Sequence, residues 1–145
     1  MSTNAITRRT PVQLAAMAVG AVFLLVGILG FVPGITSGMI GFAGLGSHAM
    51  LLGVFQVSVL HNIVHLLFGV AGLVLARTFS GARGFLVWGG AIYLVLFVYG
   101  LVFGDDSGGN FVPVNMADNV LHLVLGIGMI AVGLVLGRNV AAARR

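Results

Sequence analysis

Cysteine is absent from this chain of 145 residues, and charged side chains are scarce, at 7% of the total. Without cysteine there can be no disulfide, no thiolate metal site and no cysteine nucleophile. Soluble domains carry about 25% charged residues. So few charges cannot cover a surface in contact with water, whereas 59% of the residues are hydrophobic. The composition therefore predicts an integral membrane protein, and the length suits a single domain over residues 1–145.

The motifs that often reveal an enzyme are also missing. The sequence contains no glycine-rich phosphate loop, no GxSxG nucleophile turn and no HExxH zinc motif. It offers no catalytic residue, and it favours a role other than catalysis. The seven basic residues are arginines at segment ends rather than in a basic stripe, so nucleic acid is not an expected partner.

Long apolar runs mark the expected membrane helices. Four runs, of roughly 20 residues or more, are long enough to cross about 30 Å of hydrocarbon. They cover residues 12–31, 51–76, 84–103 and 117–137. The second run exceeds what one crossing needs, so we expect this helix to be tilted or to project beyond the bilayer. The glycine-rich connection 32–50 is expected to lie along the membrane surface or over the helices.

The distribution of charge predicts the orientation. With four crossings, the N-terminus, the turn 77–83 and the C-terminus share one side, which carries all seven arginines. The other side carries Asp105, Asp106 and, at its edge, Asp118. The positive-inside rule then places both termini in the cytoplasm, so a cytoplasmic membrane is the expected location.

One segment of the chain occurs twice. Residues 61–77 read HNIVHLLFGVAGLVLAR, and residues 118–138 read DNVLHLVLGIGMIAVGLVLGR. A four-residue insertion, about one helical turn, separates the two parts of the match. The fold predicted from this repeat is all-α, a four-transmembrane-helix bundle built from two parallel-repeat hairpins. Segments 12–31 and 84–103 show no comparable match. The first part of the alignment pairs His61 with Asp118, Asn62 with Asn119, His65 with His122 and Gly69 with Gly126.

The repeat places ionisable side chains at membrane depth, where they are costly and therefore suggest a functional site. Residues four apart share a helix face, so His61 and His65 lie on one stripe, and Asp118 and His122 lie on its equivalent. Small residues continue both stripes and let membrane helices approach closely. We therefore expect the second and fourth helices to pack stripe to stripe, with His65 and His122 in contact.

Three interpretations of this cluster remain open. The first is a buried hydrogen-bond network in a structural or accessory protein, where Asp118 or an asparagine is the partner of each imidazole. The second is a site for a transition metal such as zinc, iron, nickel or copper(II). The third is a path for protons or small solutes, or haem held between His65 and His122. The metal ligands would be His61, His65, Asp118 and His122, with Asn62 and Asn119 flanking the stripes to orient the rings.

Lipid is the first expected partner of such a chain. The Phe-, Leu- and Val-rich faces of helices 12–31 and 84–103 remain for lipid or for another protein. Glycines on the first helix would allow close contact between two copies, so a homo-oligomer is a further expectation.

Three stretches of the chain resemble one known family. They are TPVQLAAMAVGAVFLLVGILGFVPGI near the N-terminus, LLGVFQVSVLHNIVHLLFGVAGLVLAR in the middle and NFVPVNMADNVLHLVLGIGMIAVGLVLGR near the C-terminus. The family, of small bacterial four-helix membrane proteins, is catalogued as domain of unknown function 4383, and the resemblance covers nearly the whole chain. It implies four spans in a bacterial membrane, but it brings no activity, ligand or site residue with it.

Overall fold

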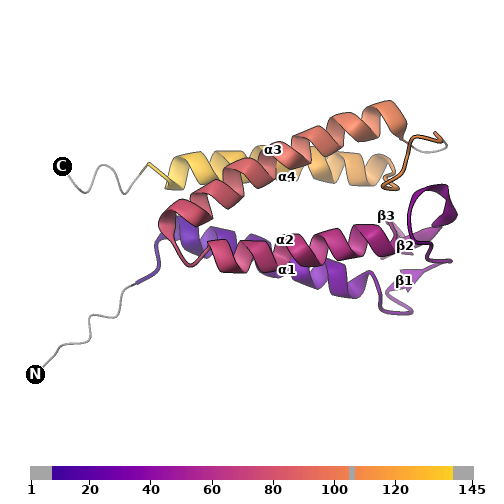
Figure 1. Cartoon of the computed structure of the whole chain (residues 1–145), viewed down its shortest axis with the longest axis horizontal. Helices are drawn as coiled ribbons and strands as arrows, with labels where there is room; N and C mark the ends of the chain where they lie inside the picture. Colours follow the sequence, from indigo (N-terminus) through magenta and orange to yellow (C-terminus); the bar gives the residue numbers. More distant parts are fainter. Residues whose placement is uncertain (1–7, 105–106, 139–145) are drawn as a thin grey trace, which may run out of the picture.

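The computed structural model describes residues 8–104 and 107–138. It is mostly helical, and its four helices form two neighbouring hairpins (Figure 1). The first hairpin contains α1 (Pro11–Leu29) and α2 (Val59–Leu75), and the second contains α3 (Phe79–Phe103) and α4 (Met116–Leu136). By length and composition α1, α3 and α4 are able to cross a membrane, while α2 is a shorter apolar helix of 17 residues.

Three short strands lie between α1 and α2 and form an antiparallel sheet. They are β1 (Thr36–Ser37), β2 (Ala49–Leu51) and β3 (Phe55–Val57), with β2 in the centre. The inward side chains of β2 and β3 are buried and pack against Val26 and Leu29 of α1. The sheet therefore lies over the end of the first hairpin, opposite the end where α2 turns into α3 (Figure 1).

The sheet corrects two expectations. The second helix begins at Val59 rather than at residue 51, and the fold is not purely helical. Leu52 and Gly53 turn the chain between β2 and β3 with φ angles of 54° and 70°, which a right-handed helix does not permit. The Ser58 side chain then accepts a hydrogen bond from the His61 backbone N–H at 3.1 Å and caps the helix. Because α2 is shorter than predicted, the argument that excess length tilts it does not hold.

The third helix also begins at a different place from the predicted one. It starts at Phe79 rather than at residue 84, so Arg83 lies on the helix and not in a turn. Thr78 caps this helix, because its side-chain oxygen accepts a hydrogen bond from the Gly81 backbone N–H at 3.1 Å. The connection from α2 to α3 is correspondingly short.

The closest helix packing lies within each hairpin, α1 on α2 and α3 on α4. A Cβ atom at Gly20 would lie 3.0 Å from the Gly69 carbonyl oxygen, and one at Gly90 would lie 2.7 Å from the Gly126 carbonyl oxygen. Only glycine permits such close approach of two backbones. The prediction that α2 and α4 pack stripe to stripe is therefore wrong, because each glycine stripe faces the helix within its own hairpin.

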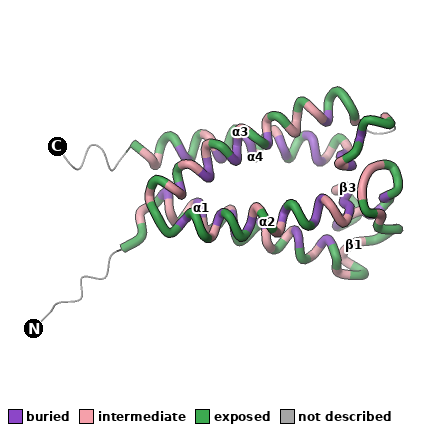
Figure 2. Tube along the Cα trace, viewed as in Figure 1, coloured by how far each residue is buried: buried purple, intermediate pink, exposed green. Residues whose placement is uncertain are grey.

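The buried residues lie along the helix faces that meet, and the outward faces are exposed (Figure 2). Many of the exposed side chains are large and apolar, including Leu67, Trp88, Val95 and Val124. A water-soluble protein rarely leaves so much apolar surface uncovered, so this surface suits a lipid environment. The buried hydrophobic cluster between the hairpins comprises Val12, Ala16, Phe23, Ala76, Ala82, Phe85, Leu86, Tyr93 and Met129.

Candidate ligand cavity between the hairpins

A cavity of about 120 Å³ lies between the two hairpins, next to the sheet. Its walls come from all four helices and from the β2–β3 hairpin. Its polar groups are the four side chains predicted from the repeat, His61, His65, Asp118 and His122, together with Tyr93. Its apolar lining consists of Val26, Leu29, Leu51, Leu52, Phe55, Val57, Leu121 and Leu125.

The two imidazoles of α2 stack on each other. Their ring centroids lie 4.5 Å apart with an angle of 8° between the planes, as expected for side chains one helical turn apart. His65 also meets the edge of Phe23 at 5.5 Å. Both histidines are more than nine-tenths buried.

On the other side of the cavity, the imidazole of His122 meets the ring of Tyr93 at 5.2 Å, edge to face. Tyr93 in turn stacks on Phe23 at 5.3 Å. His65 and His122 therefore contact different rings. Among the described residues, the expected direct contact between these two histidines is not found. Phe23 and Tyr93 lie between them in the chain of ring contacts.

The histidines lack the polar partners that a hydrogen-bond network would supply. The Nδ1 atoms of His61, His65 and His122 are all buried, and none has a hydrogen-bond partner among the described residues. A buried polar atom normally has such a partner, and leaving it without one costs roughly 1–3 kcal/mol. Both polar side-chain atoms of Asn62 and the Oδ1 of Asn119, which do not line the cavity, are likewise buried without a partner among the described residues.

Asp118 bonds to backbone amides rather than to the imidazoles. Its Oδ2 accepts hydrogen bonds from the backbone N–H groups of Gln56 and Asn115, each at 3.0 Å. The Asn115 side chain accepts from the Asp118 backbone N–H at 3.0 Å, which completes a reciprocal cap at the start of α4. Because Gln56 belongs to β3, the carboxylate also fastens the sheet to α4.

The two asparagines of the repeat face away from the cavity. The Asn62 side chain lies against Gly30 at the end of α1, and the Asn119 side chain lies against Gly100 of α3. Neither makes a hydrogen bond to a histidine among the described residues. Their predicted role in orienting the rings therefore has no contact to support it.

The metal and haem interpretations can be compared with this geometry. Within residues 8–104 and 107–138, no group of three or more His, Cys, Asp or Glu side chains is arranged so that it could hold a metal ion. The volume of about 120 Å³ is also well below the roughly 300–1,000 Å³ of sites for drug-sized ligands. Haem therefore does not fit the cavity.

Sequence reasoning missed two contributors to the site. Tyr93 and Phe23 read as packing residues of apolar helices, although a hydroxyl at membrane depth is a signal that should have singled out Tyr93. The cap of α4 also had a signal, since Asn115 and Asp118 are spaced as a capping pair directly before an apolar run.

Comparison with known proteins gives one result. The family model described as Domain of unknown function (DUF4383) matches residues 13–135 of the chain. No curated protein and no solved structure matches it.

Proposed function

The chain belongs to the DUF4383 family, and from that premise we propose that it is a small integral membrane protein that binds a small polar ligand in the cavity beneath its sheet. The observation that carries this proposal is the set of three buried imidazoles whose Nδ1 atoms lack partners around one cavity. In a purely structural network these atoms would be satisfied by neighbouring side chains. The Nδ1 atoms are closed to a water-sized molecule, so the rings have to turn toward the cavity before a ligand or an ordered water there can bond to them.

The size and lining of the cavity limit the ligand. About 120 Å³ holds a few water-sized groups, at roughly 30 Å³ each. Neutral imidazoles can accept or donate a hydrogen bond, and the Asp118 carboxylate can also neutralise a positive charge, while the other walls are apolar. The proposed ligand is therefore a small polar molecule or cation of a few heavy atoms.

Binding is favoured over conduction by what lies beyond the cavity. Phe23 stacks on Tyr93, and both meet the ring of Phe68, which is one turn further from the sheet than His65. Phe23 is almost fully buried, at 1% exposure. These apolar rings separate the cavity from the opposite end of the hairpins, so a continuous polar path is not supported.

A transition metal is the second candidate ligand. The observation in its favour is that His61, His65, Asp118 and His122, the proposed metal ligands, all line the same cavity. Their rings would have to turn toward a common centre to bind a metal, since the present arrangement is not a preformed ligand set.

Thermal unfolding of the full chain in mild detergent, with added probes, tests the proposal. The probes are methylammonium, imidazole and Zn²⁺, and the variants are His65→Phe and His122→Phe, with the exposed loop histidine in His48→Phe as the control. At 100 times its dissociation constant, a probe that binds only the folded state stabilises it by about 2.7 kcal/mol. At least one probe should raise the midpoint of the wild type and of the control, but not of the cavity variants.

The outcomes separate the two candidates. A response to Zn²⁺ alone, with about one metal per chain, would select the metal site. A response to the organic probes would select the small polar ligand. If no probe moves the midpoint, or if the cavity variants respond like the wild type, the proposed function is rejected.

We further propose that the two hairpins are structural repeats within a four-helix bundle. A Cβ atom at Gly69 would overlap the side chain of Leu24, and a Cβ atom at Gly126 would overlap the side chain of Leu94. The contact between Gly30 and Asn62 in the first hairpin recurs between Gly100 and Asn119 in the second. The glycines are 70 residues apart and the asparagines 57 residues apart. The stacked pair Phe23 and Tyr93 occupies equivalent positions, which supports an axis between the hairpins.

The proposed location is a bacterial cytoplasmic membrane with both termini in the cytoplasm. Asp105, Asp106, Arg144 and Arg145, on which part of the charge argument rests, lie outside the described residues. The described arginines support the orientation, because they lie on segments at the end of the hairpins opposite the sheet (Figure 1). They are Arg8, Arg9, Arg77, Arg83 and Arg138.

A further inference from the structure

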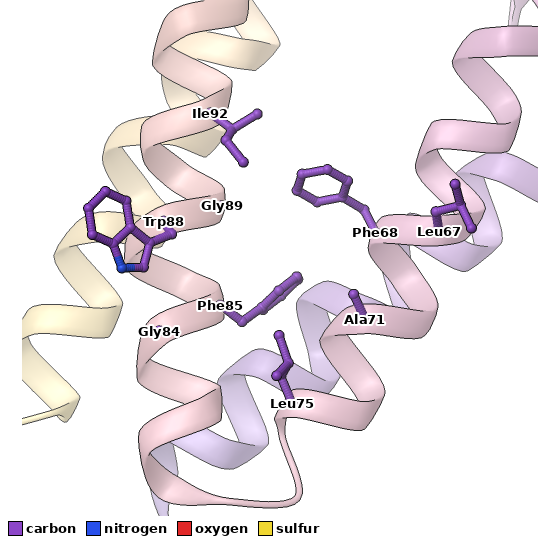
Figure 3. Close-up of a pocket in the computed structure, with 9 residues that line it drawn as sticks. All are labelled: Leu67, Phe68, Ala71, Leu75, Gly84, Phe85, Trp88, Gly89 and Ile92. Carbon is purple, nitrogen blue, oxygen red and sulfur yellow. The ribbon is translucent and has the colours of Figure 1, made fainter.

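A second hollow, of about 440 Å³, lies between α2 and α3 and is separate from the histidine cavity. Leu75, Ala71 and Phe68 project into it from α2, and Phe85 projects into it from α3 (Figure 3). Every residue that lines it is apolar or glycine. The remaining lining residues are Leu67, Gly84, Trp88, Gly89 and Ile92.

A polar pocket of about 340 Å³ adjoins this apolar groove on α3. The two share Gly84 and Trp88 as lining residues. This pocket is called polar because it adds Ser80 and the exposed side chain of Arg83, its only charged group. The apolar residues Phe79 and Val87 also line it. It lies in the first turns of α3, at the end of the hairpins where the described arginines gather.

We propose that the groove and the polar pocket together bind one anionic phospholipid, with an acyl chain between α2 and α3 and the phosphate on Arg83 and Ser80. Guanidinium groups pair with phosphate through two parallel hydrogen bonds, and a serine hydroxyl can donate a third. Basic pockets between helices on the cytoplasmic side of a membrane are typical sites for such headgroups. Trp88 is 73% exposed and lines both pockets, so its ring is accessible to a lipid bound there.

Charge complementarity favours a lipid over a second copy of this chain as the occupant. Among the residues that the structure describes, the only acidic side chain is Asp118, which is buried at the sheet end. The helices of another copy would therefore offer apolar surface to the groove but no described anion to Arg83. A phospholipid satisfies both pockets with one molecule.

Two variants and a matched control test the site. A Cβ at Gly84 would meet no heavy atom within 4 Å, so Gly84→Leu fits the fold and blocks the passage between the pockets. Gly128 of α4 is equally open and lies outside both pockets, so Gly128→Leu is the control. Arg83→Gln removes the charge but leaves the groove intact.

Native mass spectrometry of the full chain in mild detergent measures lipid retention directly. The probes are phosphatidylglycerol and phosphatidylcholine with the same acyl chains. The wild type and Gly128→Leu should retain one phosphatidylglycerol per chain, with a preference of about tenfold over phosphatidylcholine. Arg83→Gln should lose the preference and still retain lipid, whereas Gly84→Leu should retain neither lipid.

Three results would overturn the proposal. They are equal retention of the two lipids by the wild type, an unchanged preference in Arg83→Gln, and unchanged retention in Gly84→Leu. A lipid-free dimer that Gly84→Leu converts to a monomer would assign the groove to a second copy. The inference rests on the proposed membrane location, but the variants leave the histidine cavity untouched, so a failure of this test is distinct from a failure of the proposed ligand binding.

Discussion

Glycine and asparagine form matched contacts in the two hairpins. A Cβ at Gly30 would overlap the side chain of Asn62, and one at Gly100 would overlap the side chain of Asn119. Both asparagines are almost fully buried, so an added Cβ would have to displace a packed side chain. These glycines therefore set how closely α1 approaches α2 and how closely α3 approaches α4.

Alanine at either glycine should destabilise the protein. We expect Gly100→Ala and Gly30→Ala to lower the free energy of unfolding by roughly 1–3 kcal/mol, because overpacking displaces a buried side chain. Gly128→Ala is the control, since its Cβ meets nothing within 4 Å and alanine favours a helix by up to about 1 kcal/mol. Denaturation in mild detergent measures all three. Equal stability of Gly100→Ala and the control would refute the contact.

The sequence was informative about which side chains converge, and less so about their bonds. Ionisable groups avoid lipid, so His61, His65, Asp118 and His122 could be predicted to face a shared interior, and they do line one cavity. Their partners were not predictable in this way. A carboxylate near a helix start can bind a ligand or cap the helix. Here the Asp118 carboxylate accepts hydrogen bonds from the backbone amides of Gln56 and Asn115 instead.

At the scale of elements, both ends of α1 and α4 and the end of α3 were predictable to within two residues, because apolar runs mark them. The start of α2 was not, since a short apolar run fits a buried strand as well as a helix. The local signals that distinguish them were present, namely Gly53 in the strand turn and Ser58 as a cap before the histidines.

Which helices pack together was harder to predict than the helices themselves. A stripe of small residues says that a helix approaches another closely, but it does not say which one. The glycines of α2 meet α1, and those of α4 meet α3, because neighbours along the chain form hairpins. The repeat itself was visible only in α2 and α4, where the polar residues drew attention to it.

At the scale of the whole molecule, the orientation in the membrane can be tested with two cysteines in this cysteine-free chain. Ser80 lies at the arginine-bearing end of α3, and Ser107 follows the opposite end of the same helix. We expect cysteines at these positions to react with a membrane-impermeant reagent from opposite sides, with Ser107→Cys labelled in intact cells. Labelling of both positions from one side would refute the proposed topology.

The most direct test of the central claim, that the histidines serve a ligand rather than a structural network, is the free energy of unfolding of ligand-free His122→Phe. Phenylalanine keeps a ring against Tyr93, the adjoining cavity can take its extra volume, and the buried Nδ1 has no partner to lose. The account predicts that the free energy of unfolding stays equal to that of the wild type or rises. A fall of about 1–3 kcal/mol, the usual effect of leaving a hydrogen-bond partner unsatisfied, would contradict it.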